Sequence, residues 1–328
     1  GDMKKFILTI TSIIVILILS IFIGSKTKKE DTEKIVVSEV THSVFYAPWY
    51  AAIENGYFKD ENLDVEVVLT PGADKVATSI ISGDANIGFS GPEATIYLYN
   101  NSKQKLITFA ALTKRDGQFI VGDCALKDNF KMSDLVGKKV LAGRSAGMPL
   151  MMFEYALYKS NIESKSVNID TSVEFSGLTG AYIGGNGDFV NLFEPNALAL
   201  EKQGYGCVLA SLGEISGIVP YTTFYAKEEY IKNNSINIKK FNKALNKGLR
   251  FVKTNDSKTI ASAIINQFPD TSLDDLTKIV DRYKQADSWY DSTYIYKGDY
   301  DRLEDIMIYG GTIKEKVNPS ILITNDFN

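Results

Sequence analysis

The residues best suited to bind a small molecule lie in one aromatic segment early in the chain. Five ring-bearing side chains fall within nine positions, and they are His42, Phe45, Tyr46, Trp49 and Tyr50. Rings can stack on a flat ligand, and the imidazole can also hydrogen-bond to it. The segment joins a strand predicted at 34–40 to a short predicted helix that stops at Gly56, which is where open α/β sheets bind ligands. Alternatively, the rings belong to an amphipathic helix and pack in the core.

Further candidates combine hydroxyl, carboxylate and aromatic groups in loops that follow later predicted strands. They are Ser90, Gly91, Glu93, Arg144, Phe193, Glu194 and Tyr221. Ser90 can offer a hydroxyl and a backbone N–H, and the carboxylates can accept hydrogen bonds from an amine. Two alternatives stay open. The glycine-containing loops can be plain turns, and Glu194 can be a helix N-terminal carboxylate stabilised by the helix dipole.

Catalytic chemistry is poorly represented in the sequence. His42 is the only histidine, so any histidine-dependent triad would have to use it. The chain has no P-loop, HExxH or CxxC pattern. We therefore expect no enzymatic activity, no cofactor and no metal site.

The N-terminus has the layout of an export signal. Lys4 and Lys5 precede an apolar run at 6–23, and a lysine-rich segment follows. Gly1 and Asp2 precede Met3 and resemble a tag remnant. Ser25 stands where a lipoprotein would carry its lipidated cysteine, so residues 1–33 are either an uncleaved anchor or a lipoprotein leader whose cysteine has been lost or replaced. Both alternatives predict a protein on the extracytoplasmic face of a bacterial membrane.

The rest of the composition is that of an ordinary globular protein. The 328 residues are 45% hydrophobic and 23% charged, which suggests two domains after the leader. The net charge of −4 argues against nucleic-acid binding, which needs clustered lysine and arginine. Cys124 and Cys207 are the only cysteines, and we expect them to be buried free thiols.

Strand-like and helical patterns alternate along the chain, which predicts an α/β fold with largely parallel sheets. Two such units are followed by an almost wholly helical stretch from Lys227 onward, which we expect to pack back on the first unit. The chain would then cross between lobes near Leu112–Asp116 and Pro220–Thr223, forming a hinge. The expected lobes are 34–112 with 223–328, and 113–222.

Three segments carry a family resemblance, which covers residues 35 to 315. They are YAPWYAAIENGYFKDENLDVEVV, SGDANIGFSGPEA and LFEPNALALEKQGYG. Together they resemble the extracellular substrate-binding proteins of ABC importers, in the branch that handles nitrate, sulfonates, taurine and thiamine-pyrimidine precursors. The resemblance implies a two-lobed type II periplasmic-binding fold that closes on a small molecule and delivers it to a membrane permease. It also implies a monomer. A related branch builds the thiamine pyrimidine from its own histidine, but its cysteine-rich motif is absent here.

The side chains expected at the cleft favour one ligand class. Trp49, Tyr50 and Phe193 supply rings, Glu93 and Glu194 supply carboxylates, and Arg144 is the sole nearby cation. This set suits a heteroaromatic cation or an aminopyrimidine. We therefore predict thiamine or a thiamine pyrimidine precursor as ligand, with sulfonate, taurine or nitrate as the alternative. A surface adhesin without a transport role is the alternative from another class.

Overall fold

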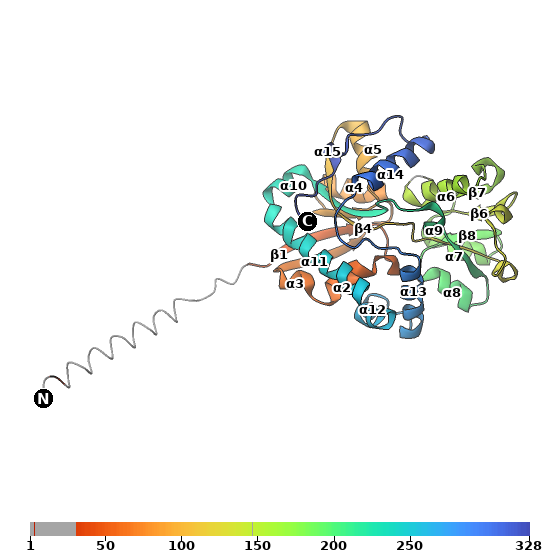
Figure 1. The fold of residues 1–328 in the computed structure, drawn as a ribbon, viewed down its shortest axis with the longest axis horizontal. Helices are drawn as coiled ribbons and strands as arrows, with labels where there is room; N and C mark the ends of the chain where they lie inside the picture. Colours follow the sequence, from red (N-terminus) through yellow and green to blue (C-terminus); the bar gives the residue numbers. More distant parts are fainter. Residues whose placement is uncertain (1–2, 4–30, 146) are drawn as a thin grey trace. The chain divides into compact units, whose positions relative to one another are not determined.

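The computed structural model describes residue 3 and residues 31–145 and 147–328. Residues 34–328 form one compact unit (Figure 1). Apart from Met3 and residues 31–33, the predicted leader lies outside the described residues. In the described ranges, no helix is both long and apolar enough to cross a membrane.

Within the described residues, ten strands form two five-stranded sheets. The first sheet has the order β2-β1-β3-β10-β4, and its strands are β1 (Glu33–Glu39), β2 (Leu63–Leu69), β3 (Ile87–Ser90), β4 (Leu106–Thr113) and β10 (Thr222–Lys227). The second has the order β7-β6-β8-β5-β9, and its strands are β5 (Phe119–Gly122), β6 (Lys139–Leu141), β7 (Asn168–Asp170), β8 (Phe189–Leu192) and β9 (Cys207–Ser211). The lobe limits predicted from the sequence describe two bodies that move relative to each other. Those limits stay a prediction.

Each sheet contains one strand that runs against its neighbours, an exception to the predicted parallel arrangement. β1 and β3 pair in parallel, whereas β10 is antiparallel to both β3 and β4. Likewise, β6 pairs in parallel with β7 and β8, whereas β5 is antiparallel to β8 and β9. β5 and β10 are the strands that the chain forms directly after passing from one sheet to the other, so they enter from the opposite direction.

Helices cover both faces of each sheet (Figure 1). Those that flank the first sheet are α2 (Ala47–Glu54), α3 (Tyr57–Asp60), α4 (Ala73–Ser82), α5 (Glu93–Ser102), α10 (Glu228–Asn233), α11 (Ser235–Thr254), α12 (Ser257–Ile264), α13 (Leu273–Gln285), α14 (Lys297–Tyr309) and α15 (Pro319–Leu322). Those of the second are α6 (Met148–Lys159), α7 (Leu178–Ile183), α8 (Asn196–Lys202) and α9 (Leu212–Ser216). Short 3₁₀ turns lie between them, the first of them η1 (Val44–Tyr46).

Strand alternation decides which helices meet each face of the first sheet. Phe224 of β10 points to the face covered by α2 and α11, where its ring stacks on Phe89 at a centroid distance of 4.2 Å. The next residue, Tyr225, points to the opposite face with Val76 of α4 and Ala94 of α5. Successive side chains of a strand point to opposite faces, so both faces carry a buried core.

Cys124 and Cys207 form a disulfide, so the prediction of free thiols is wrong. Strand pairing explains the contact, because Gly122 at the end of β5 lies opposite Cys207 in β9. Cys124 follows two residues later in a 3₁₀ turn, which brings the two Cα atoms to 4.9 Å. The cysteines are 83 positions apart in the chain, so no local pattern indicated that they pair.

The second sheet is tied to α13, which follows β10 in the chain. The Tyr283 hydroxyl donates to the carbonyl oxygen of Gly117, and Arg282 pairs with Glu194 and Glu201. Lys202 of α8 pairs with Asp275 of α13. These contacts join elements of both sheets beside the segments through which the chain crosses.

Candidate functional site

A cavity of about 640 Å³ lies at the carboxyl ends of strands from both sheets. Its lining includes the loops after β1, β3, β6 and β8, together with the second crossing segment at 221–222. Ligands of open α/β folds bind at this edge, because the loops that leave the strands converge there. At the base, the Ser43 hydroxyl donates to the Glu194 carbonyl oxygen over 2.7 Å and joins the two sides.

Eight of the eleven candidate residues line this cavity. They are His42, Tyr46, Gly91, Glu93, Arg144, Phe193, Glu194 and Tyr221. Trp49, Tyr50 and Ser90 do not belong to the lining. The structure therefore brings together candidates that are up to 179 positions apart in the chain, while it places three of them elsewhere.

Trp49 and Tyr50 lie in the core, which corrects the prediction that they form a ligand wall. Helix α2 begins at Ala47, so both residues lie within it and not in the preceding loop. Both side chains are fully buried, and the Trp49 ring packs among phenylalanines, including Phe89 and Phe241. Ser90 is also satisfied internally, since its hydroxyl shares a 2.7 Å hydrogen bond with the Tyr225 hydroxyl.

Glu39 is a buried carboxylate that the sequence did not single out. It accepts hydrogen bonds from the Tyr50 hydroxyl at 2.6 Å and from Trp49 Nε1 at 3.2 Å, and its other oxygen lies 3.1 Å from His42 Nδ1. His42 Nε2 lies 2.8 Å from the Gln267 carbonyl oxygen. Burial alone would lower the pKa of His42, but the bonds to Glu39 and Gln267 and the Glu39 charge raise it. Protein groups thus engage both ring nitrogens, so only the face of the imidazole ring is available for contact with a ligand.

Glu93 has a buried carboxyl oxygen that can still accept a hydrogen bond. The residue is 1% exposed at the start of α5, and Oε2 has no hydrogen-bond partner among the described residues. Burial raises the pKa of Glu93 to about 7, against backbone hydrogen bonds from Glu93 and Met148. Gly91 allows this placement, because a Cβ there would collide with the Glu93 carboxyl group. A buried acceptor without a partner is costly, so a ligand donor at Oε2 would be favourable.

Glu194 has the opposite character, although it lines the same cavity. One carboxyl oxygen pairs with Arg282, and the other accepts the backbone N–H of Leu198 over 2.9 Å. Burial raises the pKa of Glu194, while the charge of Arg282 opposes the shift. This is the helix N-terminal role that the sequence left open. Both carboxyl oxygens are already engaged by α8 and α13, so neither is offered to a ligand.

Arg144 is also paired. Its guanidinium lies 3.2 Å from the Asp74 carboxylate in the first turn of α4, so the pair joins the loop after β6 to the first sheet's helices. The other lining carboxylates are Glu93, Glu174 and Glu194. Among the described lining residues, acidic groups therefore outnumber Arg144 and His42, and the cavity favours cations or neutral ligands with amino groups.

Aromatic rings form much of the remaining wall. They belong to Tyr46, Tyr97, Phe175, Phe193 and Tyr221. Tyr97 and Phe175 were not among the candidates predicted from the sequence. Tyr97 lies one helical turn after Glu93, a spacing that could have identified it. Phe175 lies in a stretch without regular pattern, and its ring reaches Phe193 at a centroid distance of 5.8 Å.

Tyr221 connects the cavity to the first crossing segment. Its side chain interacts with buried Asp116, which accepts hydrogen bonds from the backbone N–H of Gln118 at 2.8 Å and from its amide at 3.0 Å. Burial raises the pKa of Asp116 to about 7. The floor of the cavity is thus continuous with a polar cluster at the crossing.

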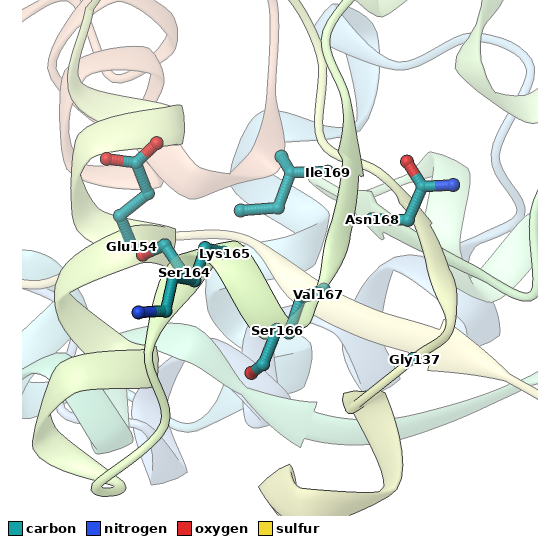
Figure 2. Close-up of a pocket in the computed structure, with 8 residues that line it drawn as sticks. All are labelled: Gly137, Glu154, Ser164, Lys165, Ser166, Val167, Asn168 and Ile169. Atoms are coloured by element: carbon teal, nitrogen blue, oxygen red, sulfur yellow. The ribbon is translucent and has the colours of Figure 1, made fainter.

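A second hollow of about 680 Å³ lies elsewhere, beside α6 and β7 (Figure 2). Its lining is Gly137, Glu154, Ser164, Lys165, Ser166, Val167, Asn168 and Ile169. It shares no residue with the first cavity and contains no ring. Across the described residues, no group of three or more histidine, cysteine, aspartate or glutamate side chains is placed to hold a metal ion.

Comparison with known proteins places the chain in a family. Residues 44–258 match the family model described as NMT1/THI5 like. "Putative binding protein YtlA" of Bacillus subtilis is 38% identical over 312 residues, which span 94% of this chain and 93% of that protein.

Solved structures agree on the fold. The alkanesulfonate-binding protein SsuA of Xanthomonas axonopodis superposes with a TM-score of 0.71 at 12% identity, covering 90% of this chain and 99% of SsuA. The nitrate-binding protein NrtA of Synechocystis gives 0.71 at 15% identity, covering 91% of this chain and 87% of NrtA. The predicted two-lobed periplasmic-binding fold is confirmed, and the chain belongs to the NMT1/THI5-like family.

Proposed function

We propose that this protein is the ligand-binding receptor of an ABC importer and that its ligand is thiamine or a thiamine pyrimidine precursor. The observation that carries the choice of ligand is Glu93, which lines an aromatic cavity and whose buried Oε2 has no hydrogen-bond partner among the described residues. A carboxylate there can accept a hydrogen bond from an exocyclic amine while the rings of Tyr97, Phe193 and Tyr221 contact the heterocycle.

The charge of the cavity separates this ligand from an anion. Sulfonate and nitrate receptors need free donors, such as arginine or backbone N–H groups. Here Arg144 is engaged by Asp74, and an anion near Glu93 would be repelled. The alternative ligand class of sulfonate, taurine or nitrate would require Arg144 to leave Asp74 and turn to the ligand.

The proposal includes a location and partners. The receptor acts as a monomer outside the cytoplasmic membrane, held there by its N-terminal segment, and delivers ligand to a membrane permease. The Cys124–Cys207 disulfide supports an extracytoplasmic location, because disulfides persist in oxidising compartments. Catalysis forms no part of the proposed role.

Native mass spectrometry of the purified full chain tests the ligand class, because a closed cleft can retain what it bound in the cell. We expect an added mass that matches thiamine or an aminopyrimidine. The same protein, freed of ligand and heated with thiamine, hydroxymethylpyrimidine, taurine or nitrate, should melt higher only with the first two. At a concentration 100-fold above the dissociation constant the gain is about 2.7 kcal/mol. Stabilisation by taurine or nitrate alone would reject the ligand class and leave a receptor role standing.

A further inference from the structure

The cavity continues beyond Glu93 into a groove between two helices of the first sheet. Helix α4 contributes Ala73, Ala77 and Ile81, which are spaced by four residues and so share one face. Helix α5 contributes Ala94 and Leu98 with the same spacing. These five residues define the α4–α5 groove. The two helices lie side by side in the fold (Figure 1).

The groove differs chemically from the part of the cavity between the sheets. Its five defining side chains are all apolar, and Ala77 and Ala94 are each 6% exposed. Small side chains at these two positions leave space between the helices, while Ile81 and Leu98 are half-buried beside it. At its far end the lining becomes polar and exposed, with Thr78, Asn101 and Gln104.

A ligand with one ring would leave this groove unfilled. Cavities of 300–1,000 Å³ typically enclose drug-sized molecules, and the full cavity measures about 640 Å³. Glu93 stands at the first residue of α5, next to Ala94, so a head group at its Oε2 would direct any extension into the groove. Burying the apolar side chains of the groove is favourable when the group that covers them is itself apolar.

We propose that the α4–α5 groove is a subsite for an uncharged, apolar extension of the ligand, whose amine-bearing head lies at Glu93. This inference rests on the proposed function, since it assumes a head group at Glu93. It predicts that, among ligands with a heterocyclic head, those with an alkyl or aryl extension bind more tightly than those without one. A bare single-ring heterocycle would occupy only the head position.

The test is a homologous series of 4-amino-2-methylpyrimidines that carry methyl, propyl, butyl or hexyl groups at carbon 5. Calorimetry with the full chain should show affinity rising by about fourfold for each methylene that enters the groove, the factor expected for burying one methylene. Ala77→Phe fills the groove and should abolish this rise. Leu98→Gln, at a half-buried site that tolerates a polar side chain more easily, should reduce it. Lys75→Phe places the same ring on the exposed side of α4 and should leave the rise intact.

The outcomes separate this inference from the proposed function. If all members of the series, including the methyl compound, bind with equal affinity, the proposed subsite in the α4–α5 groove is rejected. The proposed head-group site at Glu93 is not affected by this result. A rise that persists in both Ala77→Phe and Leu98→Gln, with melting curves showing folded protein, also rejects the subsite. If no member of the series binds, the head site itself is rejected and the groove inference falls with it.

Discussion

Two glutamates border the same cavity and differ in whether the protein satisfies them. Glu93 stands on the side of the first sheet, and one of its buried carboxyl oxygens has no hydrogen-bond partner among the described residues. Glu194 stands on the side of the second sheet with both oxygens engaged, by Arg282 and by the N–H of Leu198. From the sequence, both were predicted to be candidate acceptors for the ligand, with a helix N-terminal role left open for Glu194. Unfilled hydrogen-bond capacity, more than residue type, therefore distinguishes a binding group from a structural one.

The largest expected effect is a pH dependence of folding that comes from Glu93. The Glu93 pKa is raised from 4.5 to about 7 in the fold, so between these values the folded protein holds a proton that the unfolded chain has released. The contribution of Glu93 to the free energy of unfolding is therefore fully present below about pH 4.5. It falls by about 3 kcal/mol as the pH rises through 7. Asp116 and Glu304, whose pKa values are also raised to about 7, act in the same direction, and so does Glu194, whose pKa is raised by burial.

Urea unfolding of the ligand-free protein between pH 4.5 and 8 measures this effect. Glu93→Gln should remove the contribution of Glu93, so the free energy of unfolding should change less with pH. The contributions of the other buried carboxyl groups remain. A profile identical to that of wild type would mean that the fold does not raise the pKa of Glu93, and the description of Glu93 as a buried carboxyl group without a partner would fail.

Replacing Glu194 should mainly affect stability. Glu194→Gln breaks the pair with Arg282, and we expect a loss of about 2–3 kcal/mol, below the 3–5 kcal/mol of fully buried pairs because Arg282 is partly exposed and keeps Glu201. Guanidinium unfolding at pH 7 measures it, with Glu201→Gln as the matched control that leaves the Glu194 pair intact. Unchanged stability together with a large loss of ligand affinity would make Glu194 a binding group after all.

The smallest effect is expected at the rim of the cavity. Asp74→Asn frees Arg144, but Asp74 is exposed and such pairs contribute about 0–1 kcal/mol, so the melting temperature should change little. The informative readout is taurine binding, which should appear or strengthen once Arg144 is free. If taurine binds wild type as well as it binds the variant, Arg144 is not held away from anions by Asp74.

Much of the fold could be predicted because its signals are local. The predicted alternation of strands and helices and the predicted helical stretch from Lys227 onward are both present in the structure, since helix periodicity and short apolar runs lie within one element. The direction of β5 and β10 could not be read in this way, because it depends on which sheet the preceding segment belongs to. The disulfide was missed because Cys124 and Cys207 are 83 positions apart in the chain and meet only through the pairing of β5 with β9.

The candidate site was predicted as a set of loops more reliably than as a set of side-chain roles. Strand ends located the loops that carry His42, Glu93 and Phe193. The role of Trp49 was wrong because the helix begins two residues before it and turns its ring to the core. Glu39 and Arg282, which satisfy His42 and Glu194, act through contacts that only the folded chain creates.

The most direct test of the account is calorimetry on wild type and Glu93→Gln with thiamine, hydroxymethylpyrimidine, taurine and nitrate. If Glu93 accepts a hydrogen bond from an amine of the ligand, wild type should bind thiamine or the pyrimidine, and the substitution should weaken that binding by about 1.5–3 kcal/mol, the strength of a charge-assisted hydrogen bond. Tight binding of taurine or nitrate by wild type, unchanged or improved in Glu93→Gln and with no heat from thiamine or the pyrimidine, would contradict the account.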